Sequence, residues 1–111
     1  MLGVLNLFNI LPEKQELYDR YLAEVQPLLT RYESRILFYG QTQIICLGDY
    51  PQEYCGLVIY PDMKAIKGLS NDADFKRIRA WRDESTTDFI MVILDEVQFD
   101  EGFVNVQADS N

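Results

Sequence analysis

The sequence predicts an α+β fold in which helices cover one face of a four-stranded antiparallel sheet. Two apolar runs, residues 57–60 and 89–94, flank a helical segment in the second half of the chain. Both runs are apolar at consecutive positions, whereas a strand wet on one face alternates apolar and polar residues. We therefore expect both strands to be buried on both faces. The 111 residues supply one domain, expected to span 1–96, followed by a tail at 97–111.

The first half of the chain predicts a strand followed by an amphipathic helix. Residues Leu2–Ile10 are apolar almost throughout and form the expected first strand. Pro12 suits the first turn of a helix because its missing N–H needs no partner there. Apolar residues then recur at spacings of three and four, as on a helix packed on a sheet, at Leu17, Tyr21, Val25, Leu28 and Tyr32. Pro27 is expected to kink this helix or to begin a separate last turn.

The middle of the chain predicts a pair of strands joined by a turn. Residues 35–47 form the expected second strand, in which Gly40 and the polar residues after it indicate a bulge or bend. Residues 48–51, Gly-Asp-Tyr-Pro, are typical of a turn. The third strand is expected at residues Tyr54–Tyr60.

The second half of the chain predicts two helices and a last strand. Asp62 is the expected N-cap of a short helix, and Asn71 that of a second helix with Trp81 on its buried edge. The last strand is expected at Thr86–Leu94. The resulting order, β-α-β-β-α-β, is that of the ferredoxin-like fold, with both helical layers on one face of the sheet.

The other face of this sheet must also be covered. A bare apolar sheet face exceeds the patch of a few hundred Å² that monomers usually tolerate. We expect a second copy of the chain to cover it, giving a homodimer with a barrel-like interior, the dimeric α/β barrel. A monomer whose tail folds over the sheet is the alternative. The tail at 97–111 carries Phe99, Phe103, Val104 and Val106 among acids and is expected to pack on the body or on a partner chain.

Composition excludes several classes of protein. The net charge of −8, from 18 acidic and 10 basic side chains, repels phosphate backbones and argues against nucleic-acid binding. The apolar runs are far shorter than a membrane-spanning helix. The apolar N-terminus lacks a basic leader, so we expect a first strand and a cytoplasmic protein, not an exported one.

The chain contains no histidine, which limits its chemistry. A histidine-activated nucleophile, a His-ligated haem and a His-based metal site are excluded, so no metal or other cofactor is expected. Cys46 and Cys55 are too far apart for a CxxC motif. A disulfide between them across two strands would be strained, and we expect two reduced, buried thiols.

Several motifs resemble domain-of-unknown-function family 1330 (DUF1330), in the dimeric α/β-barrel superfamily. They are the turn residues Gly48, Tyr50 and Pro51, the step Tyr60-Pro61-Asp62, then Phe75, Arg82-Asp83, Ser85 and Asp88, with Tyr18, Tyr21, Pro27 and Arg35 earlier in the chain. The sequence departs from the family pattern at Glu33-Ser34, where Gly-Gly is usual, and at Ile59, where an acid is usual. The resemblance covers about residues 1–96 and implies a small pocket between sheet and helices. In several relatives that pocket performs cofactor-free oxygenation, isomerisation or decarboxylation.

The residues themselves offer candidates for such a pocket: Arg35, Tyr39, Tyr60, Arg82, Asp88 and Asn6. An arginine near apolar walls can clamp an anionic group through two hydrogen bonds, and a tyrosine can donate to a developing oxyanion. Ile59 in place of the family's acid argues against proton abstraction. The alternative is that both arginines pair with acids at strand and helix ends, while the tyrosines pack with their hydroxyls in water.

Two functions compete at this point. The first is a binder of a small anionic molecule, or an enzyme that transforms one without metal or haem. The second is a non-enzymatic module whose sheets only form the dimer and whose surface or tail meets a protein partner. A cavity of a few hundred Å³ lined by Arg and Tyr favours the first, and a filled interior favours the second.

Overall fold

The structure, a computed structural model, describes residues 1–98. Its elements are β1 (Leu2–Ile10), the 3-10 turn η1 (Pro12–Lys14), α1 (Gln15–Arg31), β2 (Arg35–Gln41), β3 (Tyr54–Tyr60), α2 (Met63–Asn71), α3 (Ala73–Ser85) and β4 (Thr86–Leu94). The strands form one antiparallel sheet in the order β2-β3-β1-β4. The predicted ferredoxin-like α+β fold is therefore confirmed. Within residues 1–98, no helix is long and apolar enough to cross a membrane.

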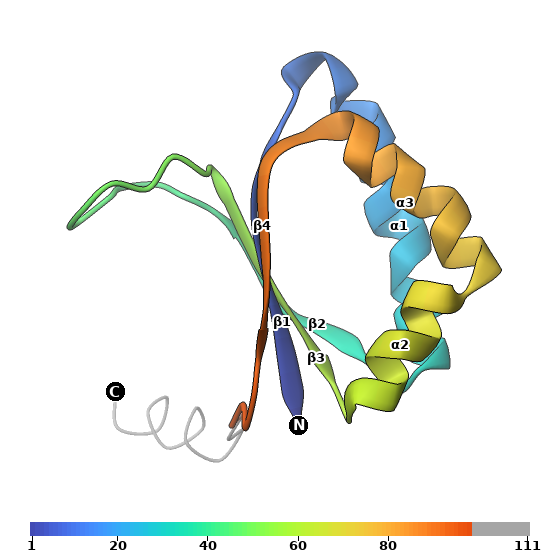
Figure 1. The fold of residues 1–111 in the computed structure, drawn as a ribbon. Coiled ribbons are helices and arrows are strands. Elements are labelled where there is room, and N and C mark those ends of the chain that lie inside the picture. The colour runs from blue at the N-terminus through green and yellow to red at the C-terminus, as the bar shows by residue number, and fades with distance from the viewer. Residues whose placement is uncertain (99–111) are drawn as a thin grey trace, which may run out of the picture.

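The described α-helices all lie on one side of the sheet, as Figure 1 shows. Strand alternation directs Val4 and Phe8 of β1 toward these helices, where both are buried. They meet apolar residues of α1 and α3, among which Ile78 is fully buried. The Phe8 ring stacks on that of Phe89 with 5.0 Å between ring centroids. The sheet and its helices thus share a single core.

The opposite face of the sheet carries the other alternate set of side chains from each strand. Leu5 of β1 lies opposite Leu57 on one side and Val92 on the other, so these three share this face, which we call the open face. Leu57 is buried in the centre of the sheet, whereas Val92 is 41 % exposed and Phe38 46 % exposed. A subunit therefore has an open sheet, and a barrel would require a second copy.

The last strand differs from its prediction. On its helix-facing side Met91 and Ile93 are 46 % and 50 % exposed, whereas burial was expected; Ile90, Val92 and Leu94 lie on the open face, which the prediction left to a second copy to cover. The physical reason is that β4 is an edge strand, with a neighbour only on the β1 side. The expectation holds for β3, which is central and largely buried.

The tail prediction can be followed only at its first residues. The backbone N–H of Val97 donates to the carbonyl of Met1 at 3.1 Å. A Cβ added at Gly3 would approach Val97 Cγ2 to 2.9 Å, so Val97 lies directly over β1 at this glycine. Residues 99–111 lie outside the described residues, and packing of the tail on the body or on a partner chain stays a prediction.

The second strand ends earlier than predicted. β2 stops at Gln41 instead of continuing to residue 47, and its bulge lies between Ile36 and Phe38 instead of at Gly40. Both cysteines are free, as expected. Cys46, however, is exposed, because it lies in the segment beyond the strand, and its predicted burial is wrong.

The helix ends are fixed by aspartate caps. Asp62 caps α2 as predicted, accepting from the N–H of Ala65 at 2.9 Å. The cap of α3 is Asp72, not Asn71, because Asp72 accepts from the N–H groups of Asp74 and Phe75. α1 continues through Pro27 to Arg31 without a separate last turn.

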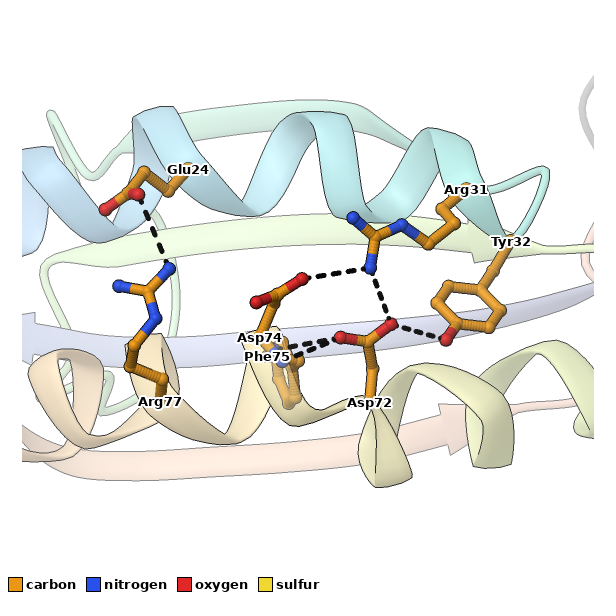
Figure 2. Close-up of polar contacts among 7 residues, drawn as sticks. All are labelled: Glu24, Arg31, Tyr32, Asp72, Asp74, Phe75 and Arg77. Carbon is orange, nitrogen blue, oxygen red and sulfur yellow. Dashed lines mark hydrogen bonds and ion pairs between the residues drawn. The ribbon is translucent and has the colours of Figure 1, made fainter.

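Asp72 also ties the end of α1 to the junction of α2 and α3, as Figure 2 shows. The Tyr32 hydroxyl donates to its carboxylate at 2.6 Å and Arg31 Nη1 donates at 2.9 Å. These contacts hold the pKa of Asp72 at about 2, with the Tyr32 hydrogen bond as the largest cause. These hydrogen bonds hold the C-terminal end of α1 against the N-terminal end of α3.

Candidate functional site

A cavity of about 210 Å³ lies between the sheet and the helices. Most of its wall is apolar or aromatic, including Phe8, Phe75 and Phe89. Gly56 of β3 lines it opposite Asn6 of β1 and leaves the space that a side chain would fill. The polar and charged lining residues are Asn6, Tyr18, Tyr21, Tyr39, Tyr60, Ser70, Arg79 and Arg82. Among the described lining residues there is no carboxylate.

Arg82 is a charged residue whose side chain is largely buried in this wall. Its side chain leaves the last turn of α3 and is only 16 % exposed. The guanidinium lies 5.3 Å from the ring centroid of Phe89 and 5.9 Å from that of Tyr21. Nε and Nη2 both donate to Asp83 at 3.2 Å. Arg82 is thus paired with an acid at a helix end, as the simpler alternative expected, and lines the cavity as well.

Four tyrosines surround the same space. Burial raises the pKa of Tyr60 to about 12, and burial likewise raises the pKa of Tyr39 to about 12. Burial also raises the pKa values of Tyr18 and Tyr21, and the positive charge of Arg82 opposes the rise at both. The same charge opposes the rise at Tyr60. The guanidinium is therefore close to three tyrosine hydroxyls, all of which are protonated donors at neutral pH.

The cavity opens beside β4. Met91 and Ile93 lie on the helix-facing side of this strand and line the cavity, yet they are 46 % and 50 % exposed. Arg79 and the exposed Ser70 line the cavity from the helical layer. Two arginines thus make the cavity locally positive in a chain whose net charge is −8.

The structure brings together four of the six predicted site residues. Asn6, Tyr39, Tyr60 and Arg82 line the cavity. In Asn6 the side-chain amide donates to the carbonyl of Val4 at 3.1 Å, so its oxygen is the group available for a ligand.

The other two candidates lie elsewhere. Arg35 begins β2 opposite Ile59, on the open face, and lines a separate hollow with Met1 and Pro61. Asp88 is exposed, has a φ of 54°, and accepts from Asn9 Nδ2 at 3.1 Å beside a bulge in the β1–β4 pairing. Neither residue contributes to the cavity wall.

Residue-level reasoning missed several lining residues. Tyr18 and Tyr21 were noted on the first helix and in the family resemblance but not proposed as site residues, and both are buried in the cavity wall. Nothing in the sequence marked Arg79 or Met91 as a site residue. Arg79 lies in a charged helical segment and Met91 in an apolar run. Only the register of β4 against β1 shows that Met91 shares a face with Asn6.

Comparison with known proteins identifies the family. The family described as Domain of unknown function (DUF1330) matches residues 6–97. The chain belongs to this family. Against curated proteins, the DUF1330 chain finds no match.

Solved structures show the same fold at low sequence identity. A protein of unknown function from Rhodopseudomonas palustris matches with a TM-score of 0.77 and 18 % identity, over 88 % of this chain and 83 % of that one. A dimeric ferredoxin-like protein of unknown function from a Jannaschia species matches with a TM-score of 0.69 and 14 % identity, over 85 % and 97 %. SnoaB, a cofactor-independent oxygenase from Streptomyces nogalater, matches with a TM-score of 0.63 and 11 % identity, over 88 % and 94 %.

Proposed function

We propose that this DUF1330 protein is a homodimer that binds a small, largely apolar anion in the cavity, with Arg82 as the anchor. The observation that carries the proposal is a guanidinium only 16 % exposed in the wall of an otherwise aromatic cavity of about 210 Å³. A cavity of this size suits a ligand smaller than a typical drug molecule.

The chemistry of Arg82 fits an anionic group. A guanidinium carries five N–H donors, so it can hold Asp83 and Tyr21 and still donate to a ligand. Hydrogen bonds between arginine and a carboxylate or enolate are strong when apolar walls exclude water. The ring faces of Phe89 and Tyr21 fix the orientation of the guanidinium.

The tyrosines would act as donors and not as bases. With pKa values of about 12, Tyr39 and Tyr60 are neutral at physiological pH and can stabilise a developing oxyanion. No described lining residue is a carboxylate that could abstract a proton. If the protein is an enzyme, its reaction should use a substrate that ionises or reacts by itself, without metal or haem. SnoaB performs a cofactor-independent reaction on this fold, which motivates that version of the proposal.

The dimer would form through the open face. The exposed apolar side chains of β2 and β4 need a cover, and a structural neighbour is described as dimeric. The interaction-module alternative anticipated a filled interior, and the cavity argues for a ligand instead. A cytoplasmic location suits two free thiols, and localisation of a tagged chain tests it.

The test uses a matched pair of probes, benzoate and the neutral benzamide. Benzoate should raise the melting temperature and bind measurably by calorimetry, whereas benzamide should bind more weakly because it lacks the charge. Arg82→Met should weaken benzoate about 10- to 100-fold, the usual cost of losing a charged hydrogen-bond partner. Arg35→Met is the control, since it removes the same charge outside the cavity wall. Equal binding of benzoate to all three chains, or no binding to any, would contradict the proposal.

A further inference from the structure

The segment between β2 and β3, residues 42–53, forms an arm. Figure 1 shows it extending from the sheet on the side opposite the helices, which is the side of the open face. An arm of this kind either folds back on its own body or reaches another molecule. The two possibilities differ in how the base and the tip of the arm are contacted.

The base of the arm is anchored to the sheet by side-chain hydrogen bonds. Asn9 Oδ1 accepts from the N–H of Glu53 at 2.7 Å, and Asn9 Nδ2 donates to the carbonyl of Pro51 at 3.3 Å. Gln52 is buried and donates from Nε2 to the carbonyl of Asp88 at 3.1 Å. Across the arm, the N–H of Thr42 donates to the carbonyl of Glu53 at 2.7 Å. The direction of the arm is therefore set by its base.

The tip of the arm is apolar and uncovered. Ile44 is 74 % exposed, Ile45 is 47 % exposed and Leu47 is 94 % exposed. Cys46 between them is exposed as well. The tip therefore does not pack on its own body among the described residues, and three large apolar side chains are presented to solvent on an anchored base.

The charge distribution indicates which partner fits. Residues 40–48 contain no charged side chain, in a chain with a net charge of −8. The centre of the open face, around Leu5, Leu57 and Val92, is also apolar. Two copies of an acidic protein repel each other least where surfaces without acidic side chains meet, and the tip of the arm at residues 40–48 and the centre of the open face are two such surfaces on one side of the molecule.

We propose that the arm clasps a second copy of this chain, with Ile44 and Leu47 of each subunit packing on the partner's open face. This inference rests on the homodimer of the proposed function and adds a second contact to it. By two-fold symmetry each subunit would give one arm and receive one. Reciprocal arms would explain why the base of the arm is hydrogen-bonded while its tip is left apolar.

The test compares charge insertions in the full chain by sedimentation velocity. Ile44→Asp combined with Leu47→Asp should weaken dimerisation at least about 100-fold, because two large apolar side chains would no longer be buried. Lys67→Glu makes the same change of charge on the exposed surface of α2 and should leave the dimer intact. Val92→Asp, on the open face, tests the dimer independently of the arm. Circular dichroism should show native structure in every variant.

A second measurement keeps the inference testable if the charged variants lose their fold. Leu47→p-benzoylphenylalanine keeps the tip apolar, and irradiation of mixed ¹⁴N- and ¹⁵N-labelled chains separates intersubunit from intrasubunit cross-links. Intersubunit cross-links to the β1, β3 or β4 strands support the clasp. The clasp would be overturned if all cross-links were intrasubunit, or if Val92→Asp broke the dimer and the arm variant did not. Either result would leave the proposed homodimer standing. A monomeric wild-type chain would overturn the clasp and the homodimer together.

Discussion

The two faces of the sheet are built from alternate residues of the same strands, yet they present different chemistry. On the helix-facing side, Asn6 and Tyr60 bring polar atoms into a cavity beside Arg82. On the open face, Leu5 and Val92 present apolar side chains. Polar atoms converging on a cavity are typical of a ligand site, whereas an exposed face with an apolar centre is typical of association. Strand alternation thus places the proposed ligand site and the proposed dimer surface on opposite faces of one sheet.

The largest difference between the faces should appear in stability. Phe8, on the helix-facing side, is 2 % exposed and contacts four other aromatic rings, whereas Phe38 on the open face is 46 % exposed. Phe8→Ala should cost about 3–5 kcal/mol of unfolding free energy, and Phe38→Ala about 1 kcal/mol. Urea unfolding in the Val92→Asp background, which removes dimer effects, measures both. Equal costs would contradict the assignment of the core to one face.

Met91 and Val92 offer the sharpest test, since they are neighbours on β4, similarly exposed and on opposite faces. Val92→Asp should weaken dimerisation at least about 100-fold by placing a charge in the interface. Met91→Asp should leave the dimer intact and weaken benzoate binding, because it puts a negative charge at the cavity mouth. Sedimentation and calorimetry on both variants check this. If Met91→Asp broke the dimer and Val92→Asp weakened benzoate binding, the assignment of dimerisation to the open face and ligand binding to the helix-facing side would be wrong.

Gly56 allows the cavity to be filled without moving its wall. A Cβ at this position would lie 3.6 Å from its nearest neighbours, in ordinary van der Waals contact. Gly56→Val should therefore fold normally and lower benzoate affinity about 10-fold by occupying part of the cavity. Gly40→Val is the control, because a Cβ there meets no atom within 4 Å. Unchanged affinity in Gly56→Val would mean that benzoate binds elsewhere.

The smallest effect concerns how the helical layer responds to acid. The pKa of Asp72 in the folded chain is about 2, below the ordinary value near 4, mainly because Tyr32 donates to it. A depressed folded pKa gives stability that is present above the unfolded value and is lost as pH falls through the folded value. Unfolding free energy should therefore fall between about pH 5 and pH 2, and Asp72→Asn should flatten that fall. Asp74→Asn is the control, since it leaves the Tyr32 contact in place. An unchanged slope in Asp72→Asn would contradict the account of this network.

Sequence patterns predicted the fold well because the fold depends on local periodicity. The order of elements, the Asp62 cap and the apolar strands follow from spacing and turn chemistry within short segments. The end of β2 was missed because Ile44, Ile45, Cys46 and Leu47 form an apolar run like that of a strand, although they lie in the arm. Nothing local distinguishes an apolar strand from an apolar arm.

The candidate site was harder to predict because it depends on contacts between distant segments. Tyr39 and Arg82 come from different elements and line one cavity. Arg35 and Asp88 were equally plausible candidates in the sequence, yet they lie outside the cavity. The register of β2 places Arg35 on the face away from the helices. The face that each strand side chain occupies follows from the register of strand pairing, which composition and spacing do not specify.

The most direct test of the central claim is a crystal of the wild-type chain soaked with 4-bromobenzoate, whose bromine is located by anomalous scattering. We expect a bromine peak inside the cavity, with the carboxylate hydrogen-bonded to Arg82. Bromine found only on the outer surface of the protein, with none in the cavity at saturating ligand, would contradict it.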